Sequence, residues 1–386
     1  MNYKIDKQFN QIHLTHKEKI NLGAFYTPIK YIHIVWDKIK NYLNDNSVIL
    51  DSSCGYGNFF DVSQAKNFNL IGNDIDVVAT NITKQNFPNV KLFNKNALEN
   101  VSREMFEIET KQQLIIIGNP PYNDTTSIIR NSIKNNNLKI DTDIKTRDYG
   151  MSFLLSYEKL QADIIAILHP LSYLIKKTNF NLLKKFTKNY KLIDSTIIDS
   201  STFKETSKSI SFPIIIALYK KDKNGMDYQY IQNFKFKTID NKIFTLNQFD
   251  YISNYIRKYP LKNQIYKKND ILFWTMRDIN ALKRNKTFID KFSYNSIIID
   301  KEKLDYYIYV DVFKQYSKSI PYYFGNLDVF IDNQLFQQYK YYFIQDTLIR
   351  WDFLQNYYKK DNIKIQIIRE KIVEYFKSLL GEHYVY

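Results

Sequence analysis

The residues best suited to chemistry in this chain form a four-residue motif that directly follows the apolar run at 114–118. The motif consists of Asn119, Pro120, Pro121 and Tyr122. Asn119 and Pro120 each precede a proline, which excludes helical backbone, and the two prolines have a fixed φ and no N–H to donate. The segment is therefore stiff and extended, and it can hold hydrogen-bond acceptors in a fixed position at the end of a buried strand.

Fixed acceptors of this kind suit a planar amino group, which attacks a methyl donor only when its nitrogen becomes pyramidal. The side-chain oxygen of Asn119 and the carbonyl of Pro120 could each accept one amino hydrogen and aim the nitrogen at the donor. The ring of Tyr122 offers a face on which a base can stack. An isolated motif of this type could also simply end a strand, so the surrounding chain has to decide.

A second motif, at 51–59, lies where a cofactor would be expected, directly after the first predicted strand. Its Gly55 and Gly57 form a Gly-x-Gly turn that lets the chain pass close to a nucleoside. The longer pyrophosphate fingerprint is incomplete, because Phe60 stands at its third glycine position. Asp74 closes the second predicted strand, where an acid accepts hydrogen bonds from ribose hydroxyls. A ligand with ribose but no phosphate favours S-adenosylmethionine over NAD.

Short apolar runs alternate with amphipathic stretches up to about residue 222, which is typical of a parallel βα-repeating sheet. Strands are predicted at 48–50, 70–72, 90–93, 114–117, 164–168, 192–198 and 210–218, and helices at 152–161, 179–188 and 363–380. The pattern predicts a doubly wound, Rossmann-like α/β fold. With a linker predicted at 220–225, the expected parts are an N-terminal extension (1–20), a catalytic domain (21–222) and a separate C-terminal domain (223–386).

The composition restricts the class of protein further. The 386 residues carry a formal net charge of +15, which favours a polyanionic partner such as nucleic acid. The single cysteine, Cys54, excludes an internal disulfide and a cysteine zinc cluster, and the five histidines lack metal-ligand spacing, so no metal is expected. No apolar run approaches the roughly 18 residues needed to cross a bilayer, so we expect a soluble, cytoplasmic protein without a membrane partner.

In this order, the motifs resemble those of the adenine-N6 DNA methyltransferases of restriction-modification systems, specifically the gamma class of amino-methyltransferases. The resemblance covers about residues 21–222. It implies methyl transfer from S-adenosylmethionine to the N6 amino group of an adenine flipped out of double-stranded DNA. It also implies a target-recognition role for residues 223–386 and, in a type II system, a cognate restriction endonuclease that acts on the same site.

The resemblance assigns a cofactor role to the methionine-contacting motif at 25–28, to Asp51 near the methionine amino group and to Asp74 on the ribose. Asn96 stands where the family usually has an aspartate for the cofactor adenine, and its oxygen can still accept a hydrogen bond. The full set of expected cofactor contacts is Phe25, Tyr26, Thr27, Pro28, Asp51, Ser53, Gly55, Gly57, Asn58, Phe59, Asp74, Ile75, Asn96, Ala97 and Asn119. Residues 148–153 and 167–170 resemble two further motifs of the family.

On the target side, the resemblance makes residues 119–122 the catalytic motif and has Tyr122 and Phe203 stack on opposite faces of the flipped base. Phe203 could equally be a core residue beside the last strands. Contacts to DNA are expected from Arg277, Lys283, Arg284 and Lys286, although a solvated basic helix face would show the same residues.

Two other functions are compatible with these motifs. RNA and protein-glutamine N-methyltransferases share the Asn-Pro-Pro-aromatic motif, because a side-chain amide also presents a planar amine. A non-catalytic DNA-binding protein could retain a degenerate methylase fold. The N-terminal motif at 23–28, Phe203 and the large C-terminal domain argue against the former, and the intact motifs at 51–59 and 119–122 against the latter.

Overall fold

The computed structural model describes residues 13–15, 26–62, 65, 68–122, 138–203 and 211–386. The chain forms two compact units, Met1–Thr245 and Leu246–Tyr386. The division falls after Thr245, whereas the sequence places it after residue 222. Residues 226–245 belong with the first unit because they contact strand β6 (Tyr190–Asp199): the Tyr230 hydroxyl donates to the carbonyl of Leu192 at 2.6 Å, and Ile239 N–H donates to Ile197.

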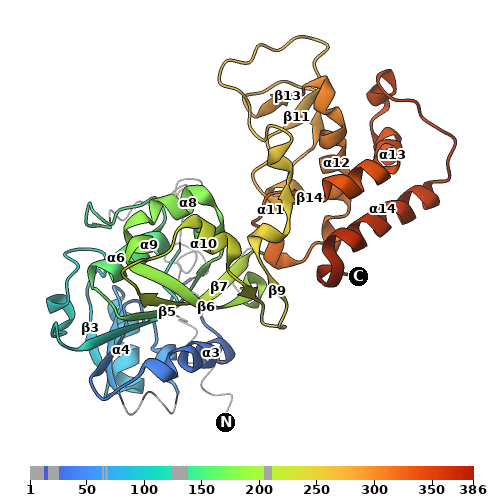
Figure 1. The fold of residues 1–386 in the computed structure, drawn as a ribbon. Coiled ribbons are helices and arrows are strands. Elements are labelled where there is room, and N and C mark those ends of the chain that lie inside the picture. The colour runs from blue at the N-terminus through green and yellow to red at the C-terminus, as the bar shows by residue number, and fades with distance from the viewer. Residues whose placement is uncertain (1–12, 16–25, 63–64, 66–67, 123–137, 204–210) are drawn as a thin grey trace. The chain divides into compact units, whose positions relative to one another are not determined.

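The first unit is built on a seven-stranded sheet in the order β3-β2-β1-β4-β5-β7-β6 (Figure 1). Besides β6, its strands are β1 (Ser47–Asp51), β2 (Asn69–Asn73), β3 (Lys91–Phe93), β4 (Gln113–Gly118), β5 (Ile164–Pro170) and β7 (Pro213–Lys221). β1 to β5 are parallel, which confirms the predicted doubly wound α/β fold. β7 runs antiparallel between β5 and β6, contrary to the expectation of a fully parallel sheet. β6 ends at Asp199 and β7 begins at Pro213, and a link of this length permits either strand direction, because a parallel crossover needs a dozen or more residues.

Helices cover both faces of this sheet, with α3 and α4 on one face and α6, α8, α9 and α10 on the other (Figure 1). Their bounds are α3 (Ile29–Ile39), α4 (Val77–Asn86), α6 (Tyr149–Lys159), α7 (Ser172–Ile175), α8 (Lys177–Leu182), α9 (Lys184–Asn189) and α10 (Tyr228–Asn233). Aspartate side chains cap three of them: Asp76 accepts from first-turn N–H groups of α4, Asp148 from those of α6, and Asp227 from the N–H of Tyr230 in α10. The helix predicted at 179–188 is broken at Leu183 into α8 and α9.

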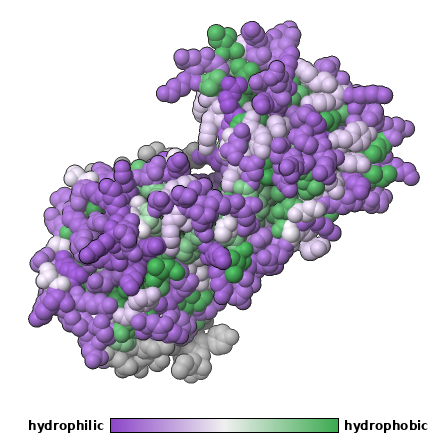
Figure 2. Space-filling view, in the orientation of Figure 1, coloured by the Kyte–Doolittle hydropathy of each residue, from purple (hydrophilic) through white to green (hydrophobic). Residues whose placement is uncertain are grey.

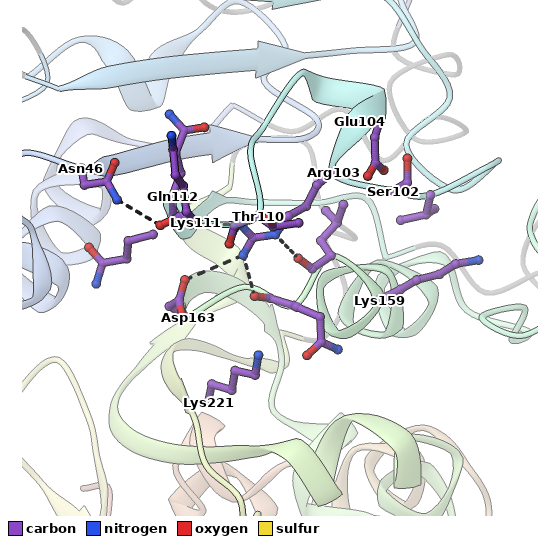
Figure 3. A pocket seen from close by; sticks show the side chains of 14 residues that line it. Asn46, Ser102, Arg103, Glu104, Thr110, Lys111, Gln112, Lys159, Asp163 and Lys221 are labelled. Atoms are coloured by element: carbon purple, nitrogen blue, oxygen red, sulfur yellow. Dashed lines mark hydrogen bonds and ion pairs between the residues drawn. The ribbon is translucent and has the colours of Figure 1, made fainter.

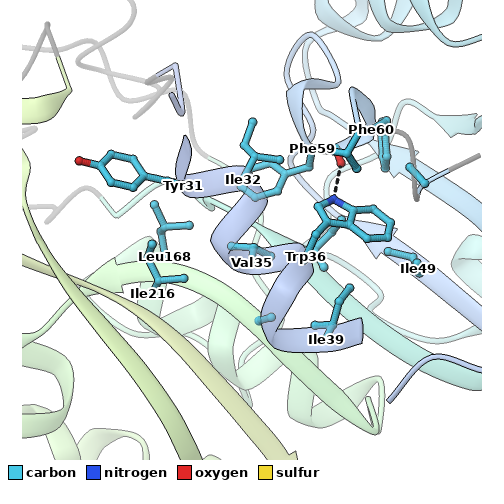
Figure 4. Close-up of a cluster of buried hydrophobic side chains, with 14 of the residues drawn as sticks. Tyr31, Ile32, Val35, Trp36, Ile39, Ile49, Phe59, Phe60, Leu168 and Ile216 are labelled. Atoms are coloured by element: carbon cyan, nitrogen blue, oxygen red, sulfur yellow. Dashed lines mark hydrogen bonds between the residues drawn. The ribbon is translucent and has the colours of Figure 1, made fainter. Parts of the chain in front are cut away.

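Helix α3 anchors the first unit's core and also the loop after β1 (Figure 4). Its apolar residues recur at helical spacing, so that Ile32, Val35 and Trp36 are buried against the sheet. The indole N–H of Trp36 donates to the carbonyl of Phe59 at 2.8 Å, within this buried cluster. The bond fixes the far end of the 51–59 loop to a rigid helix.

The second unit combines short strands with three long helices. Its elements are β10 (Asp250–Tyr251), β11 (Leu272–Trp274), α11 (Ile279–Arg284), β12 (Phe288–Ile289), β13 (Ser296–Ile298), α12 (Leu304–Gln315), β14 (Phe330–Ile331), α13 (Asn333–Arg350) and α14 (Ile365–Leu380). α14 confirms the predicted C-terminal helix, and Gly381 ends it with a positive φ. Aromatic rings join the long helices, as where Tyr309 of α12 stacks on Phe343 of α13 at 5.5 Å. None of the helices in the described ranges combines the length and the apolar character that crossing a bilayer requires.

Candidate active site

The strand order reverses between β1 and β4, and β1, β2 and β4 all end at the same edge of the sheet. In open α/β sheets, ligands bind outside the carboxyl ends of the strands at such a reversal. Asp51, Asn73 and Gly118 are the last residues of these three strands. The two predicted motifs, at 51–59 and 119–122, therefore begin at neighbouring strand ends.

The loop after β1 is held tightly against the loop after β2. The N–H of Gly55 donates to the Asp74 carboxylate at 2.8 Å, and Thr83 of α4 donates to the carbonyl of Gly55 at 2.7 Å. Gly57 has a φ of +83°, and a Cβ at this position would lie 2.8 Å from the side chain of Thr83. Only glycine allows the loop to turn this close to α4. Cys54, next to this turn, is buried, and burial raises the pKa of its thiol well above the ordinary value.

Asp51 is a strongly perturbed carboxyl group at this edge. Its side chain is 1% exposed, and burial raises the pKa of its carboxyl to about 8, with the nearby Asp74 adding to the rise and the Ser53 N–H opposing it. Gly118 makes room for this carboxyl, because a Cβ on Gly118 would lie 2.8 Å from Asp51 Oδ1. The acid at the end of β1 thus lies directly beside the residue that precedes Asn119.

Two further acids lie after β2. Burial raises the pKa of Asp74 to about 6, although its carboxylate accepts from the N–H groups of Asp76 and Gly55. His13 reaches this loop from the N-terminal part of the chain: its Nδ1 lies 2.6 Å from the Tyr56 hydroxyl and its Nε2 lies 2.6 Å from Asp76 Oδ2. The ring also stacks on Tyr56 at 5.6 Å. His13 and Tyr56 were missed by sequence reasoning, and no local spacing signals their contact.

The Asn119 amide is oriented by the N-terminal motif. Its Nδ2 donates to Thr27 Oγ1 at 3.2 Å, and Thr27 is itself buried just before α3. This bond uses the donor side of the amide and leaves Oδ1 buried without a hydrogen-bond partner among the described residues. The structure therefore brings together residues 27 and 119, which the sequence assigns to one site, whereas Phe25 lies outside the described residues.

Tyr122 lies on the other side of the motif. Its ring packs against the core cluster that includes Phe203, and a Cβ on Gly150 would lie 2.9 Å from the Cβ of Tyr122. The Tyr122 hydroxyl is buried beside the Asn119 side chain, but no bond of normal geometry joins it to a described residue. Burial, the largest effect, raises the pKa of this hydroxyl far above its usual value. The residues around Gly150, which resemble a family motif, thus support Tyr122 sterically.

Unpaired polar atoms are concentrated at this edge of the sheet. Across the described residues, seven buried side-chain polar atoms have no hydrogen-bond partner. Four of the seven belong to predicted site residues, namely Ser53, Asn58, Asn119 and Tyr122. Leaving such an atom unpaired costs about 1–3 kcal/mol, so a group of them indicates a place where a ligand supplies the missing bonds.

Two of the other predicted contacts are engaged within the protein. Asn96 donates to the carbonyl of Lys139 at 2.6 Å, and its oxygen accepts from the N–H of Leu98 at 3.1 Å, so one lone pair of that oxygen is left for a ligand. Phe203 is 2% exposed and packs against Tyr31 with ring centroids 6.2 Å apart. Its position is that of a core residue at the end of β6, and its stacking on a base stays a prediction.

The four predicted DNA contacts lie around α11 in the second unit. Arg277, Arg284 and Lys286 are exposed, whereas Lys283 is partly buried and burial lowers its pKa. Lys286 lines a cavity of about 430 Å³ together with Lys314 and Arg350. The second unit therefore presents three of the four cations to solvent.

A larger cavity, of about 710 Å³, opens at the opposite edge of the sheet, where β4 and β5 begin (Figure 3). Two of its cations, Arg103 and Lys159, already have partners. The guanidinium of Arg103 donates to the backbone carbonyls of Leu160 and Gln112 at 2.9 Å, and Lys159 pairs with Asp141 at 2.8 Å. These contacts hold together the edge of the sheet at which β4 and β5 begin. They place no reactive group in the cavity.

The fold and the site define a methyltransferase with a Rossmann-like sheet. The sequence profile described as N-6 DNA Methylase matches residues 11–312, and the chain belongs to this family. N-6 methylases use S-adenosylmethionine, which is therefore the cofactor of this protein. No curated protein gives a significant sequence match.

Similar solved structures include three methyltransferases that match about half of this chain. A TehB-like S-adenosylmethionine-dependent methyltransferase from Corynebacterium glutamicum is 14% identical, covers 49% of this chain and 87% of its own, and gives a TM-score of 0.30. An rRNA methylase from Streptococcus thermophilus is 13% identical, with 51% and 99% covered and a TM-score of 0.30. A precorrin-6y C5,15-methyltransferase from Geobacter metallireducens is 12% identical, with 52% and 91% covered and a TM-score of 0.31.

Proposed function

We propose that this protein is a site-specific DNA methyltransferase of the gamma class, which methylates the N6 amino group of an adenine flipped out of duplex DNA. It would act in the cytoplasm as the modification enzyme of a type II restriction-modification system with a cognate endonuclease. The observation that carries the proposal is the buried side-chain oxygen of Asn119 at the end of β4, which has no hydrogen-bond partner among the residues that the structure describes. An adenine amino group is the kind of donor that this acceptor lacks.

The cofactor residues fit S-adenosylmethionine on independent grounds. The side-chain oxygens of Ser53 and Asn58 in the loop after β1 are buried and have no hydrogen-bond partner in the described parts of the chain. In the proposed arrangement Asp51 holds the methionine ammonium group and Asp74 accepts hydrogen bonds from the ribose hydroxyls. When bound, S-adenosylmethionine supplies a methyl group activated by its sulfonium, so no side chain has to act as a strong base.

The chain's own contribution is to position the target amine. Asn119 Oδ1 and the carbonyl of Pro120 each accept one amino hydrogen, which favours the pyramidal nitrogen of the transition state over the planar ground state. The bond of Asn119 Nδ2 to Thr27 keeps the oxygen side of the amide turned to the base. The amino nitrogen gains the methyl group and releases one proton to solvent. Tyr122 stacks on the flipped ring and offsets part of the few kcal/mol that unstacking costs.

A substrate panel tests the proposal directly. The purified protein is incubated with cofactor carrying a labelled methyl group and with duplex DNA, RNA or a release-factor protein, and the products are analysed by mass spectrometry. We expect label in N6-methyladenine of duplex DNA. Label chiefly in RNA or in protein glutamine would replace the proposal with one of those activities, and failure to bind the cofactor would favour a non-catalytic DNA-binding role.

The role of Asn119 is tested by Asn119→Ala. Because the lost acceptor acts mainly in the transition state, we expect kcat to fall by about 10²–10³-fold. The dissociation constants for cofactor and DNA should change little. Asn356→Ala, at an exposed asparagine of the second unit, is the matched control and should leave kcat unchanged. Turnover of Asn119→Ala at the control's rate contradicts the assigned role.

A further inference from the structure

Two loops at one end of the second unit expose large apolar side chains. One loop, at 257–271, precedes β11, and the other, at 290–295, joins β12 to β13. Ile265 is 81% exposed and Tyr294 is 88% exposed, and Tyr259 and Leu261 in the first loop are each more than half exposed. Figure 2 shows hydrophobic side chains at the end of this unit that carries β11 and β13 in Figure 1, with hydrophilic side chains around them.

The two loops that carry these side chains contact each other. The rings of Tyr266 and Phe292 stack across them with centroids 5.0 Å apart and an interplanar angle of 12°. The Gln264 amide donates to the carbonyl of Ser296 at 2.5 Å. We call the surface formed by Tyr259, Leu261, Ile265, Tyr266, Phe292 and Tyr294 the tip patch.

The first loop is also tied to the rest of the unit. The carbonyl of Lys258 accepts from Met276 N–H at 2.9 Å and from Thr275 Oγ1 at 3.0 Å, and Lys258 Nζ pairs with Asp328 at 2.7 Å. These bonds fix the start of the first loop, which carries part of the tip patch, beside Arg277, one of the predicted DNA contacts.

The two loops that carry the tip patch also carry exposed cations. The exposed cations of the two loops are Arg257, Lys262, Lys267, Lys268 and Lys291. None of the five has a carboxylate within 4.0 Å in the parts of the chain that the structure describes. Only two acids occur in these loops, and Asp270 already accepts from the backbone N–H of Lys267 at 2.8 Å. The rim is thus left with net positive charge.

A patch with exposed aromatic and aliphatic residues and a cationic rim suits a polyanion that also offers flat apolar faces. Lysines neutralise phosphates, and side chains such as isoleucine and tyrosine contact or wedge between bases of a distorted duplex. An anionic bilayer is negatively charged, as DNA is, and would also attract these lysines. The patch, however, lies inside residues 11–312, which match the N-6 DNA Methylase profile. That placement favours DNA.

We propose that the tip patch binds duplex DNA, with its lysines on phosphates and Ile265 and Tyr294 against the bases. The inference rests on the proposed function and adds a surface to it: extruding a base requires the duplex to be locally distorted, and an apolar wedge supports such distortion.

The test uses the full-length double variant Ile265→Ala/Tyr294→Ala. Because contact with a base through one aromatic side chain is worth a factor of about 5 to 150, we expect Kd and KM for duplex DNA to rise at least tenfold. Cofactor Kd and kcat at saturating DNA should stay at wild-type values. The matched control is Ile365→Ala/Tyr386→Ala, which removes an isoleucine and a tyrosine that are 46% and 97% exposed elsewhere in the unit. It should leave every value unchanged.

The lysines are tested by the salt dependence of duplex binding. For Lys267→Gln/Lys268→Gln, the slope of log K against log salt should fall by about 2 in magnitude, close to 0.9 for each lost phosphate contact. An unchanged slope would show that the rim does not reach the backbone.

The results separate this proposal from the proposed function. Methylation of DNA with wild-type affinity in Ile265→Ala/Tyr294→Ala overturns the tip patch and leaves the methylase function intact. A wild-type protein that neither binds nor methylates duplex DNA overturns both. If Ile265→Ala/Tyr294→Ala binds DNA as the wild type does but no longer co-sediments with phosphatidylglycerol vesicles, the patch is a membrane-binding surface. That result also refutes the inference.

Discussion

The raised pKa of Asp51 predicts that cofactor binding releases a proton. A buried carboxyl with a pKa of about 8 is mostly protonated at neutral pH, whereas the proposed partner, a methionine ammonium group, needs it ionised. With that value, about 90% of the molecules carry the proton at pH 7, so binding should release about 0.9 proton per cofactor. The release arises because the ammonium group lowers the pKa of Asp51 well below 7.

The same linkage makes affinity depend on pH. The ionised fraction of Asp51 rises from about 1% at pH 6 to about 9% at pH 7, which strengthens cofactor binding about ninefold, or roughly 1.3 kcal/mol. Asp74, with a pKa of about 6, adds less than about twofold over the same interval. The stability of the free protein depends on pH in the opposite sense. A raised carboxyl pKa contributes stability that is complete at acidic pH and is lost as the pH rises toward 8.

Isothermal titration calorimetry measures both quantities. Cofactor is titrated at pH 7 in buffers of different ionisation enthalpy, which gives the number of protons released, and Kd is determined at pH 6 and pH 7. Asp51→Asn should bind more weakly at pH 7 and lose both the proton release and most of the pH dependence. A wild-type Kd that is equal at the two pH values, with no proton released, would refute the electrostatic reasoning.

Three further predictions concern other contacts. Gly118→Ala places a Cβ 2.8 Å from Asp51 Oδ1 at a φ of +141°, so we expect a loss of about 1–3 kcal/mol in the free energy of unfolding and weaker cofactor binding, measured by denaturation and calorimetry. His13→Ala removes the contacts to Tyr56 and Asp76 and should weaken cofactor binding several-fold, whereas His33→Ala, at an exposed position of α3, should not. Arg350→Met leaves the buried Asp311 without its 2.6 Å ion pair and should destabilise the second unit by about 3–5 kcal/mol while cofactor Kd is unchanged; equal melting of variant and wild type would contradict this.

The strands and the ends of β1, β2 and β4 could be predicted because each is a short apolar run followed by polar or glycine-containing residues. Once these strands are parallel, their ends must meet at one edge, so the proximity of the loops at 51–59 and 119–122 follows from the sequence. The antiparallel direction of β7 could not be foreseen from its composition. The connection from β6 at 200–212 does not decide it either, because a link of this length permits both directions.

The details of the site depend on contacts between distant parts of the chain. The Asn119 amide is oriented by Thr27, and the need for Gly118 comes from Asp51, which precedes it by more than sixty residues. His13 lacks any local pattern that would place it on Tyr56. The boundary after Thr245 could not be predicted for the same reason. Residues 226–245 look polar in the sequence, yet they form hydrogen bonds with β6.

The burial of Cys54 has a practical consequence for experiments on this molecule. The chain's single thiol is 5% exposed and its pKa is well above the ordinary value, so maleimide reagents should leave it unmodified in the folded protein. A cysteine introduced by Tyr294→Cys would then be the sole reactive position, and one fluorophore attached there would report directly on whether that loop meets a nucleic acid. The wild-type sequence therefore allows a single introduced cysteine to be labelled without removal of Cys54.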